Sequence, residues 1–144
     1  KLSHWVTDIV KTIRSHTDRP ILVRPHPRCR LPALEHQFKN VRRQEPRRMP
    51  GTYDDYDIKY KNIWATISYS SNPGIHSILE GVPAFVGPAS LAYDTANDVA
   101  DLQNINNARM PDRTQWLNNY AWTEFTVEEI ASGLPLKRLT SKIF

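Results

Sequence analysis

Hydrophobic residues along the chain switch between helical and strand-like spacing. Over residues 2–13 they recur every three or four positions, which predicts an amphipathic helix. Short β-rich apolar runs follow at 21–24, 65–69 and 83–86, with a weaker run at 41–44 that predicts an edge strand. A short helix is expected near 34–38. Helices and strands therefore alternate along the first two thirds of the chain, which favours an α/β fold.

The stretch 65–88 carries the clearest pattern. Its strand leads into a turn, where Asn72 can serve as N-cap and Pro73 suits the first helical position. The helix that follows ends at Gly81, and a second apolar strand comes next. Two strands joined by a helix predict a right-handed parallel crossover. In such units ligands bind at the carboxyl end of the first strand.

Helical signals dominate the last third of the chain. We expect a short helix over 90–97, an irregular segment over 98–110, and a helix that starts near Asp112. Thr126 and Glu129 have the spacing of a capping box, and Gly133 should end the helix that they begin. The prediction is a Rossmann-like three-layer sandwich with a mainly parallel sheet, comprising one domain over 1–135 and a basic tail over 136–144.

Composition narrows the class of protein. The chain has 144 residues, 40% of them hydrophobic, which suffices for one domain with a core. It lacks the run of about 18 apolar residues that a membrane span needs, and a signal-peptide core is not evident at its start. The single Cys29 excludes an internal disulfide and a cysteine metal cluster. We expect a cytoplasmic protein, and a piece of a longer polypeptide because the chain begins within a helical pattern.

Two groups of polar residues follow predicted strands. Arg24 and His26 come after the first strand. The central strand is followed by Ser70, Ser71 and Asn72, with Gly74 and Glu80 further on. Both groups should meet at the carboxyl edge of one parallel sheet. A helix N-terminus flanked by serine hydroxyls favours a phosphate group, and the histidines lack the spacing of metal ligands, so neither a metal nor another cofactor is expected.

Each of these residues also has an ordinary structural interpretation. Residues 70–74 could be a helix cap alone, His26 a turn residue between two prolines, and Glu80 a solvated helix residue. The net charge of +4 is concentrated in an arginine-rich stretch over 28–48. That stretch could be a solvated face, or it could contact an anionic partner.

The motifs taken together resemble a known family. The segments Arg24-Pro25-His26-Pro27 and Tyr69-Ser70-Ser71-Asn72, followed by Glu80-Gly81-Val82-Pro83, resemble the C-terminal nucleotide-binding domain of GT-B glycosyltransferases. More narrowly, they look like the His-Pro and Ser-Ser motifs of bacterial sialyltransferases and capsule-polysaccharide transferases that use CMP-activated sugars. Segments 87–93, 112–117 and 122–126 look like parts of uncharacterised glycosyltransferase-like proteins of bacteria and phages.

The resemblance implies roles for individual residues. His26 would contact the donor phosphate and assist departure of the nucleotide. Ser70 and Ser71 would bind the same phosphate, and Glu80 would match the acidic residue that many GT-B folds place on the ribose. The N-terminal domain of the family, which binds the acceptor and carries the catalytic base, has no counterpart here. We therefore expect the donor-binding half of the enzyme, inactive by itself.

Other functions stay open at this point. A nucleotide-sugar 2-epimerase of the same superfamily would use a similar phosphate helix and a following glutamate. A non-catalytic domain could hold nucleic acid or another polyanion on its arginines. A hybrid is an enzyme that glycosylates bases of DNA, with the basic face steering an anionic acceptor. The sequence does not identify the sugar, the acceptor or the stereochemical outcome.

Overall fold

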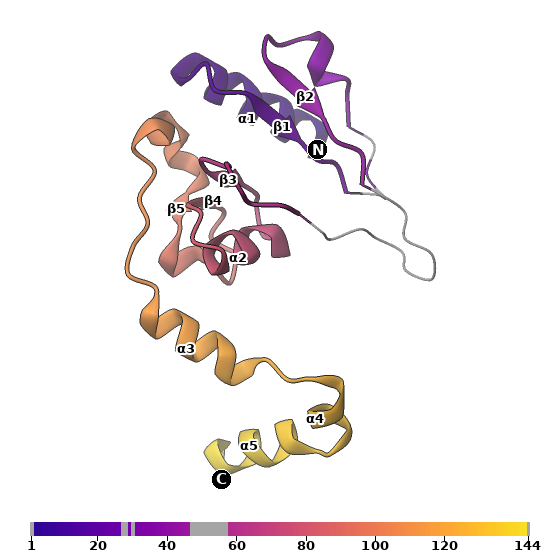
Figure 1. The fold of residues 1–144 in the computed structure, drawn as a ribbon, viewed down its shortest axis with the longest axis vertical. Coiled ribbons are helices and arrows are strands. Elements are labelled where there is room, and N and C mark those ends of the chain that lie inside the picture. Colours follow the sequence, from indigo (N-terminus) through magenta and orange to yellow (C-terminus); the bar gives the residue numbers. More distant parts are fainter. Residues whose placement is uncertain (1, 27–28, 30, 47–57, 144) are drawn as a thin grey trace. The chain divides into compact units, whose positions relative to one another are not determined.

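The computed structural model describes residues 2–26, 29, 31–46 and 58–143. The chain divides into two compact units, Lys1–Met110 and Pro111–Phe144, which we describe separately (Figure 1). The boundary of the first unit lies before the end of the domain expected over 1–135. Within the described residues, no helix combines the length and the apolar character needed to cross a bilayer.

The first unit opens with the predicted amphipathic helix. Helix α1 spans Leu2–His16 and is followed by strand β1, Ile21–Val23. Strand β2, Val41–Arg43, pairs with β1 in parallel, so the predicted edge strand is confirmed. A 3-10 helix, Leu34–His36, lies between them in the chain. Three buried side chains, one each from α1, the 3-10 helix and β2, form a core cluster: Val10, Leu34 and Val41.

The predicted parallel crossover is confirmed. Strands β3 (Thr66–Ile67) and β4 (Ala84–Val86) pair in parallel, and helix α2 (Asn72–Leu79) connects them. Strand β5, Asn97–Asp98, extends the sheet in the order β3-β4-β5. The N-cap of α2 is Ser71 rather than Asn72, because Ser71 is the last residue with extended dihedral angles (φ −86°, ψ 154°). Gly81, with φ of +77°, ends the helix region as expected.

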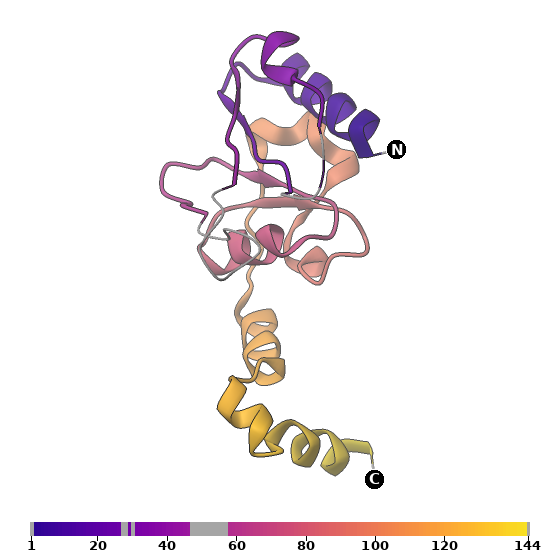
Figure 2. The same cartoon turned by 90° about the vertical axis from the view of Figure 1, so that its right-hand side faces the viewer.

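The described strands form two small parallel sheets rather than one continuous sheet. Sheet β1-β2 and sheet β3-β4-β5 share no ladder hydrogen bonds, although every strand pair in them is parallel. Pro20 and Pro25 flank β1 and carry no N–H to extend its ladder. The chain is therefore a mixed α/β protein with parallel strands and packed helices (Figure 2).

The segment after β4 differs from the prediction. Residues 90–97 contain a 3-10 turn at Tyr93–Thr95 and then enter β5, and the expected irregular segment forms 3-10 helix over Val99–Asn107. Asn97 explains the difference, because its buried side chain donates to the Ala84 carbonyl at 3.1 Å and accepts from the Arg109 N–H at 3.0 Å. The hydrogen bonds of the Asn97 side chain therefore hold β5 in place, and a hydrophobic pattern does not predict such a strand.

Hydrophobic residues of this 3-10 segment complete the core of the first unit. Leu102 and Ile105 pack with Ile13 of α1 and Phe85 of β4. Partly buried residues from both sheets join this cluster, among them Ile21 of β1 and Ile67 of β3. The same Ile21 also packs against the first cluster. The two sheets therefore share one apolar interior.

The second unit consists of three helices. They are α3 (Thr114–Thr123), α4 (Val127–Ala131) and α5 (Leu134–Ile143). The predicted capping box is confirmed, since Thr126 and Glu129 cap α4 reciprocally. Gly133, with φ of +75°, separates α4 from α5. The segment expected as a basic tail over 136–144 is helical as far as Ile143.

Candidate functional site

The turn between β3 and α2 presents exposed polar groups at a helix N-terminus. Ser70, Ser71 and Asn72, which the sequence pattern predicts to contact a phosphate, are exposed. The Ser71 side chain makes no capping hydrogen bond, and the Gly74 N–H donates to the Ser71 carbonyl at 3.0 Å. The positive end of the α2 dipole and these hydroxyls therefore lie together at the surface, an arrangement that suits an anion.

A buried hydroxyl lies directly beneath this turn. Ser68 is 9% exposed, and its Oγ has no hydrogen-bond partner among the described residues. A Cβ at Gly74 would lie 2.7 Å from that oxygen, so Ser68 points at the first turn of α2. An unpaired buried hydroxyl costs about 1–3 kcal/mol. Sequence reasoning missed Ser68, because it sits inside an apolar strand; the polar residue within that run was the available signal.

Arg24 and His26 follow β1, as expected. Arg24 is half-buried and His26 is exposed. The backbone carbonyl of His26 accepts a hydrogen bond from the Cys29 N–H at 2.8 Å, which holds His26 in a turn. His26 thus has the satisfied backbone contact of its structural interpretation, and its role toward a ligand stays a prediction.

Tyr60 links the two groups of residues. Its hydroxyl donates a hydrogen bond to the Pro73 carbonyl in α2 at 3.1 Å. Burial raises the pKa of the Tyr60 phenol above its ordinary 10.0, the charge of Glu80 raises it further, and the charge of Arg24 lowers it. Arg24, which follows β1, and Glu80, at the end of α2, therefore both affect the pKa of the Tyr60 hydroxyl. Sequence reasoning missed Tyr60, since it lies in a stretch of aromatic and acidic residues without periodicity.

Glu80 lies at the opposite end of α2 from Ser71. It is the exposed C-cap residue, and its N–H donates to the His76 carbonyl at 2.9 Å. Pro73 and Glu80 occupy the same face of the helix, two turns apart and about 10 Å along its axis. The Tyr60 hydroxyl is hydrogen-bonded to Pro73 at one end of that face, and the charge of Glu80 at the other end raises the Tyr60 pKa. The assignment of Glu80 to a ribose stays a prediction.

Within the arginine-rich stretch, Arg43 is held by contacts inside the first unit. Arg43 forms an ion pair with Glu45 and donates to the Leu31 carbonyl at 3.2 Å. Four further arginines of the stretch lie outside the described residues: Arg28, Arg30, Arg47 and Arg48. Among the residues that the structure does describe, no group of His, Cys, Asp and Glu side chains could hold a metal ion.

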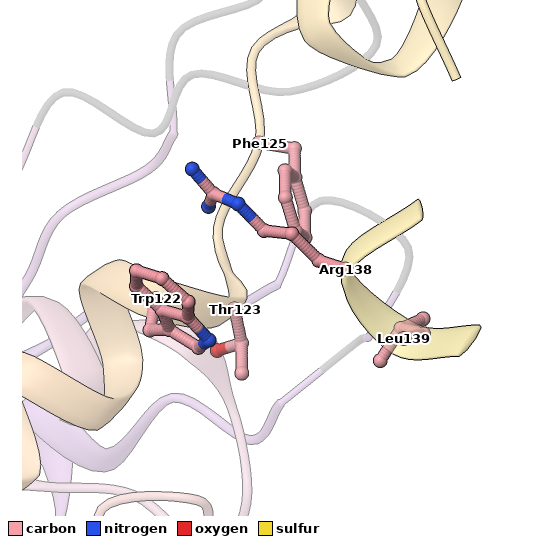
Figure 3. A pocket seen from close by; sticks show the side chains of 5 residues that line it. All are labelled: Trp122, Thr123, Phe125, Arg138 and Leu139. Carbon is pink, nitrogen blue, oxygen red and sulfur yellow. The ribbon is translucent and has the colours of Figure 1, made fainter. Parts of the chain in front are cut away.

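The second unit contains a pocket of about 410 Å³. The side chains that line it are those of Trp122, Thr123, Phe125, Arg138 and Leu139 (Figure 3). None of the residues that the sequence predicted for phosphate binding lines this pocket. Comparisons of the chain with protein-family models, with curated proteins and with solved structures found no match.

Proposed function

We propose that the first unit binds the phosphate of a nucleotide-activated sugar at the N-terminus of α2, as the donor-binding part of a GT-B type glycosyltransferase. The observation that carries this proposal is the position of Tyr60. Its hydroxyl is bonded to the first turn of α2 while its pKa responds to Arg24, which follows β1. These two effects on one side chain support a site shared by the residues after β1 and the start of α2.

Strand order supports a ligand at this place. The sheets have the orders β2-β1 and β3-β4-β5, and Ile21 of β1 and Ile67 of β3 pack against the same core. The two sheets share no ladder hydrogen bonds; a single sheet with β1 beside β3 would have the order 2-1-3-4-5, which reverses direction between those two strands. Ligands of open α/β sheets bind at the carboxyl ends of the strands where the order reverses.

The chemistry of the turn suits a single phosphate. The hydroxyls of Ser70 and Ser71 and the amides of the first turn of α2 would donate to its oxygens, and the half-buried Arg24 would offset its charge. Gly74 lets the first turn of α2 pack closely against Ser68 and Val86. One helix N-terminus with two hydroxyls matches the one phosphate of a CMP-sugar, which is why we favour that donor.

His26 would act on the leaving group. When the glycosidic bond to the phosphate breaks, negative charge grows on the departing nucleotide. An imidazole N–H aimed at that oxygen stabilises the charge, and a donor of this kind typically contributes about 3 kcal/mol. Glu80 would accept hydrogen bonds from ribose hydroxyls and so orient the nucleoside.

Titration calorimetry of the whole chain with CMP, CDP and UDP tests the proposal. We expect saturable binding with CMP preferred, weakened about tenfold in Ser70→Ala and Ser71→Ala, since a hydrogen bond to a charged group contributes about 1.5–3 kcal/mol. Ser132→Ala, an exposed serine of the second unit, is the matched control and should bind as the original chain does.

Two results would overturn the proposal. One is the absence of saturable binding to any of the three nucleotides. The other is binding that falls steeply with salt yet survives the loss of both serines, which would indicate a polyanion site on the arginines instead. A preference for UDP, together with turnover of UDP-N-acetylglucosamine without acceptor, would assign the phosphate site to a 2-epimerase.

A further inference from the structure

Helix α5 combines exposed leucines with a concentration of positive charge. Leu136 is 68% exposed and Leu139 is 55% exposed, and their spacing of three residues places them on one side of the helix. The segment 134–144 contains three cations and no acidic residue: Lys137, Arg138 and Lys142. Exposed leucines beside cations are typical of helices that lie on another surface.

An aromatic edge continues the apolar surface of α5. The Arg138 guanidinium lies over the Trp122 ring at 4.5 Å and near the Phe125 ring at 5.3 Å (Figure 3). Trp122 is 53% exposed, and Leu139 lines the same pocket as both rings. We call these residues, together with Leu136 and Lys137, the α5 surface. Tryptophan and arginine place an apolar body beside a polar or charged tip, which suits the boundary between lipid headgroups and acyl chains.

We propose that the α5 surface binds the face of a membrane that contains anionic lipids. Charge complementarity selects this partner. A symmetric contact between two α5 helices would set cations against cations, since the segment 134–144 carries no acidic residue to pair with them. The nearby Glu129 is already engaged in the capping box of α4. An anionic lipid surface attracts all the cations and also accepts the leucines.

The helix would lie in the plane of the membrane surface. Its ten residues are about 15 Å long, half of what a hydrocarbon core requires. Leu136 and Leu139 would enter the acyl boundary, while Lys137 keeps its ammonium among the headgroups. This membrane contact is independent of the proposed nucleotide site, which lies in the other unit.

Sedimentation of the whole chain with vesicles tests the proposal. The vesicles are pure phosphatidylcholine, or phosphatidylcholine with 30% phosphatidylglycerol, in about 0.1 M salt. We expect binding to the anionic vesicles alone. Lys137→Gln should weaken it roughly fivefold, the effect of one cation near such a surface. Leu136→Gln and Leu139→Gln should each weaken it about tenfold, because each removes a side chain that the acyl boundary would bury.

Val127→Gln is the matched control, since Val127 is 77% exposed on α4 and lies outside the α5 surface. It should bind as the original chain does, and circular dichroism should show equal helix content in all variants. Three results would overturn the proposal: no binding to anionic vesicles, equal binding to neutral vesicles, or binding that persists in Leu136→Gln/Leu139→Gln. Self-association in analytical ultracentrifugation that this double variant abolishes would identify a second copy as the partner and would also overturn it.

Discussion

The Tyr60 hydroxyl donates its hydrogen bond to the Pro73 carbonyl at 3.1 Å, and this contact ties the segment before β3 to the first turn of α2. The charges of Glu80 and Arg24 act on the same phenol in opposite directions. A tyrosine between a carboxylate and a guanidinium can report on the positions of both. Its titration therefore measures whether the predicted site residues lie near one another.

We predict that Tyr60 titrates above its ordinary pKa of 10.0, as burial and Glu80 require. Glu80→Gln should lower that pKa, because a neighbouring negative charge disfavours the phenolate. Arg24→Gln should raise it, because the guanidinium favours the phenolate. The measurement is a pH titration of the Tyr60 ring carbon by NMR, with ring-labelled tyrosine.

Tyr120 provides the internal control for this titration. Its pKa is also raised by burial, but its charged neighbour is Glu124 in the second unit. It should keep the same titration in both variants. If Tyr60 responds to neither substitution, Arg24 and Glu80 do not share its surroundings and the site as described is wrong.

We predict that Gly74→Ala destabilises the fold by about 1–3 kcal/mol, the usual range for overpacking. The new Cβ would lie 2.7 Å from Ser68 Oγ and 3.0 Å from Val86 Cγ1. Urea unfolding followed by circular dichroism gives the free energy of unfolding.

The Ser68→Ala background shows whether the hydroxyl is responsible. Removing Oγ should reduce the cost of Gly74→Ala, while the contact with Val86 keeps some of it. Ser68→Ala alone should be neutral or stabilising, because it removes a buried hydroxyl without a partner among the described residues. Strictly additive effects would show that Ser68 does not limit the approach of α2 to β3.

We predict an acid-dependent contribution to stability from Asp98. Hydrogen bonds from the Tyr93 hydroxyl at 2.7 Å and from the Ala100 N–H at 2.8 Å lower the pKa of Asp98 below its ordinary 3.8. A carboxyl whose pKa is lower in the folded state stabilises the protein above its unfolded pKa. That stabilisation is lost as the pH falls from about 3.8 through the folded pKa.

Urea midpoints at pH 7 and pH 3 measure this effect. Asp98→Asn keeps one of the two acceptor oxygens and cannot titrate, so its midpoint should fall less on acidification. Tyr93→Phe, which removes the first donor, should also reduce the fall. A fall of the same size in all three proteins would mean that other carboxyls account for the acid sensitivity.

Local patterns sufficed for much of the fold. Apolar spacing placed α1, β1 and the β3-α2-β4 crossover, and the Thr126 and Glu129 pair placed the start of α4. These elements are determined by residues that are close together in the sequence, so local patterns predict them. Strand β5 escaped prediction because Asn97 is held by backbone groups of Ala84 and Arg109, which are distant in sequence.

The structure differs from the sequence-based prediction in two further places. Gly133-Leu134-Pro135 predicts the end of a helix, yet proline also suits the first turn of a new one, and α5 begins at Leu134. The short strands are expected in one sheet, whereas the described strands form two. Of the proposed site, the sequence pattern points to the turn residues Ser70 and Ser71, which are exposed. It could not identify Ser68 or Tyr60, whose significance comes from tertiary contacts.

The measurement that tests the central claim most directly is amide chemical-shift mapping with CMP on the ¹⁵N-labelled chain. The claim predicts saturable shifts for the amides of Ser70, Ser71, Asn72 and Gly74, with a response at Tyr60, and no comparable shifts in the second unit. Ser71→Ala should raise the CMP concentration at half-saturation about tenfold. Shifts confined to the exposed Arg42 and its neighbours, or no saturable shift at the start of α2, would contradict a phosphate site at that helix.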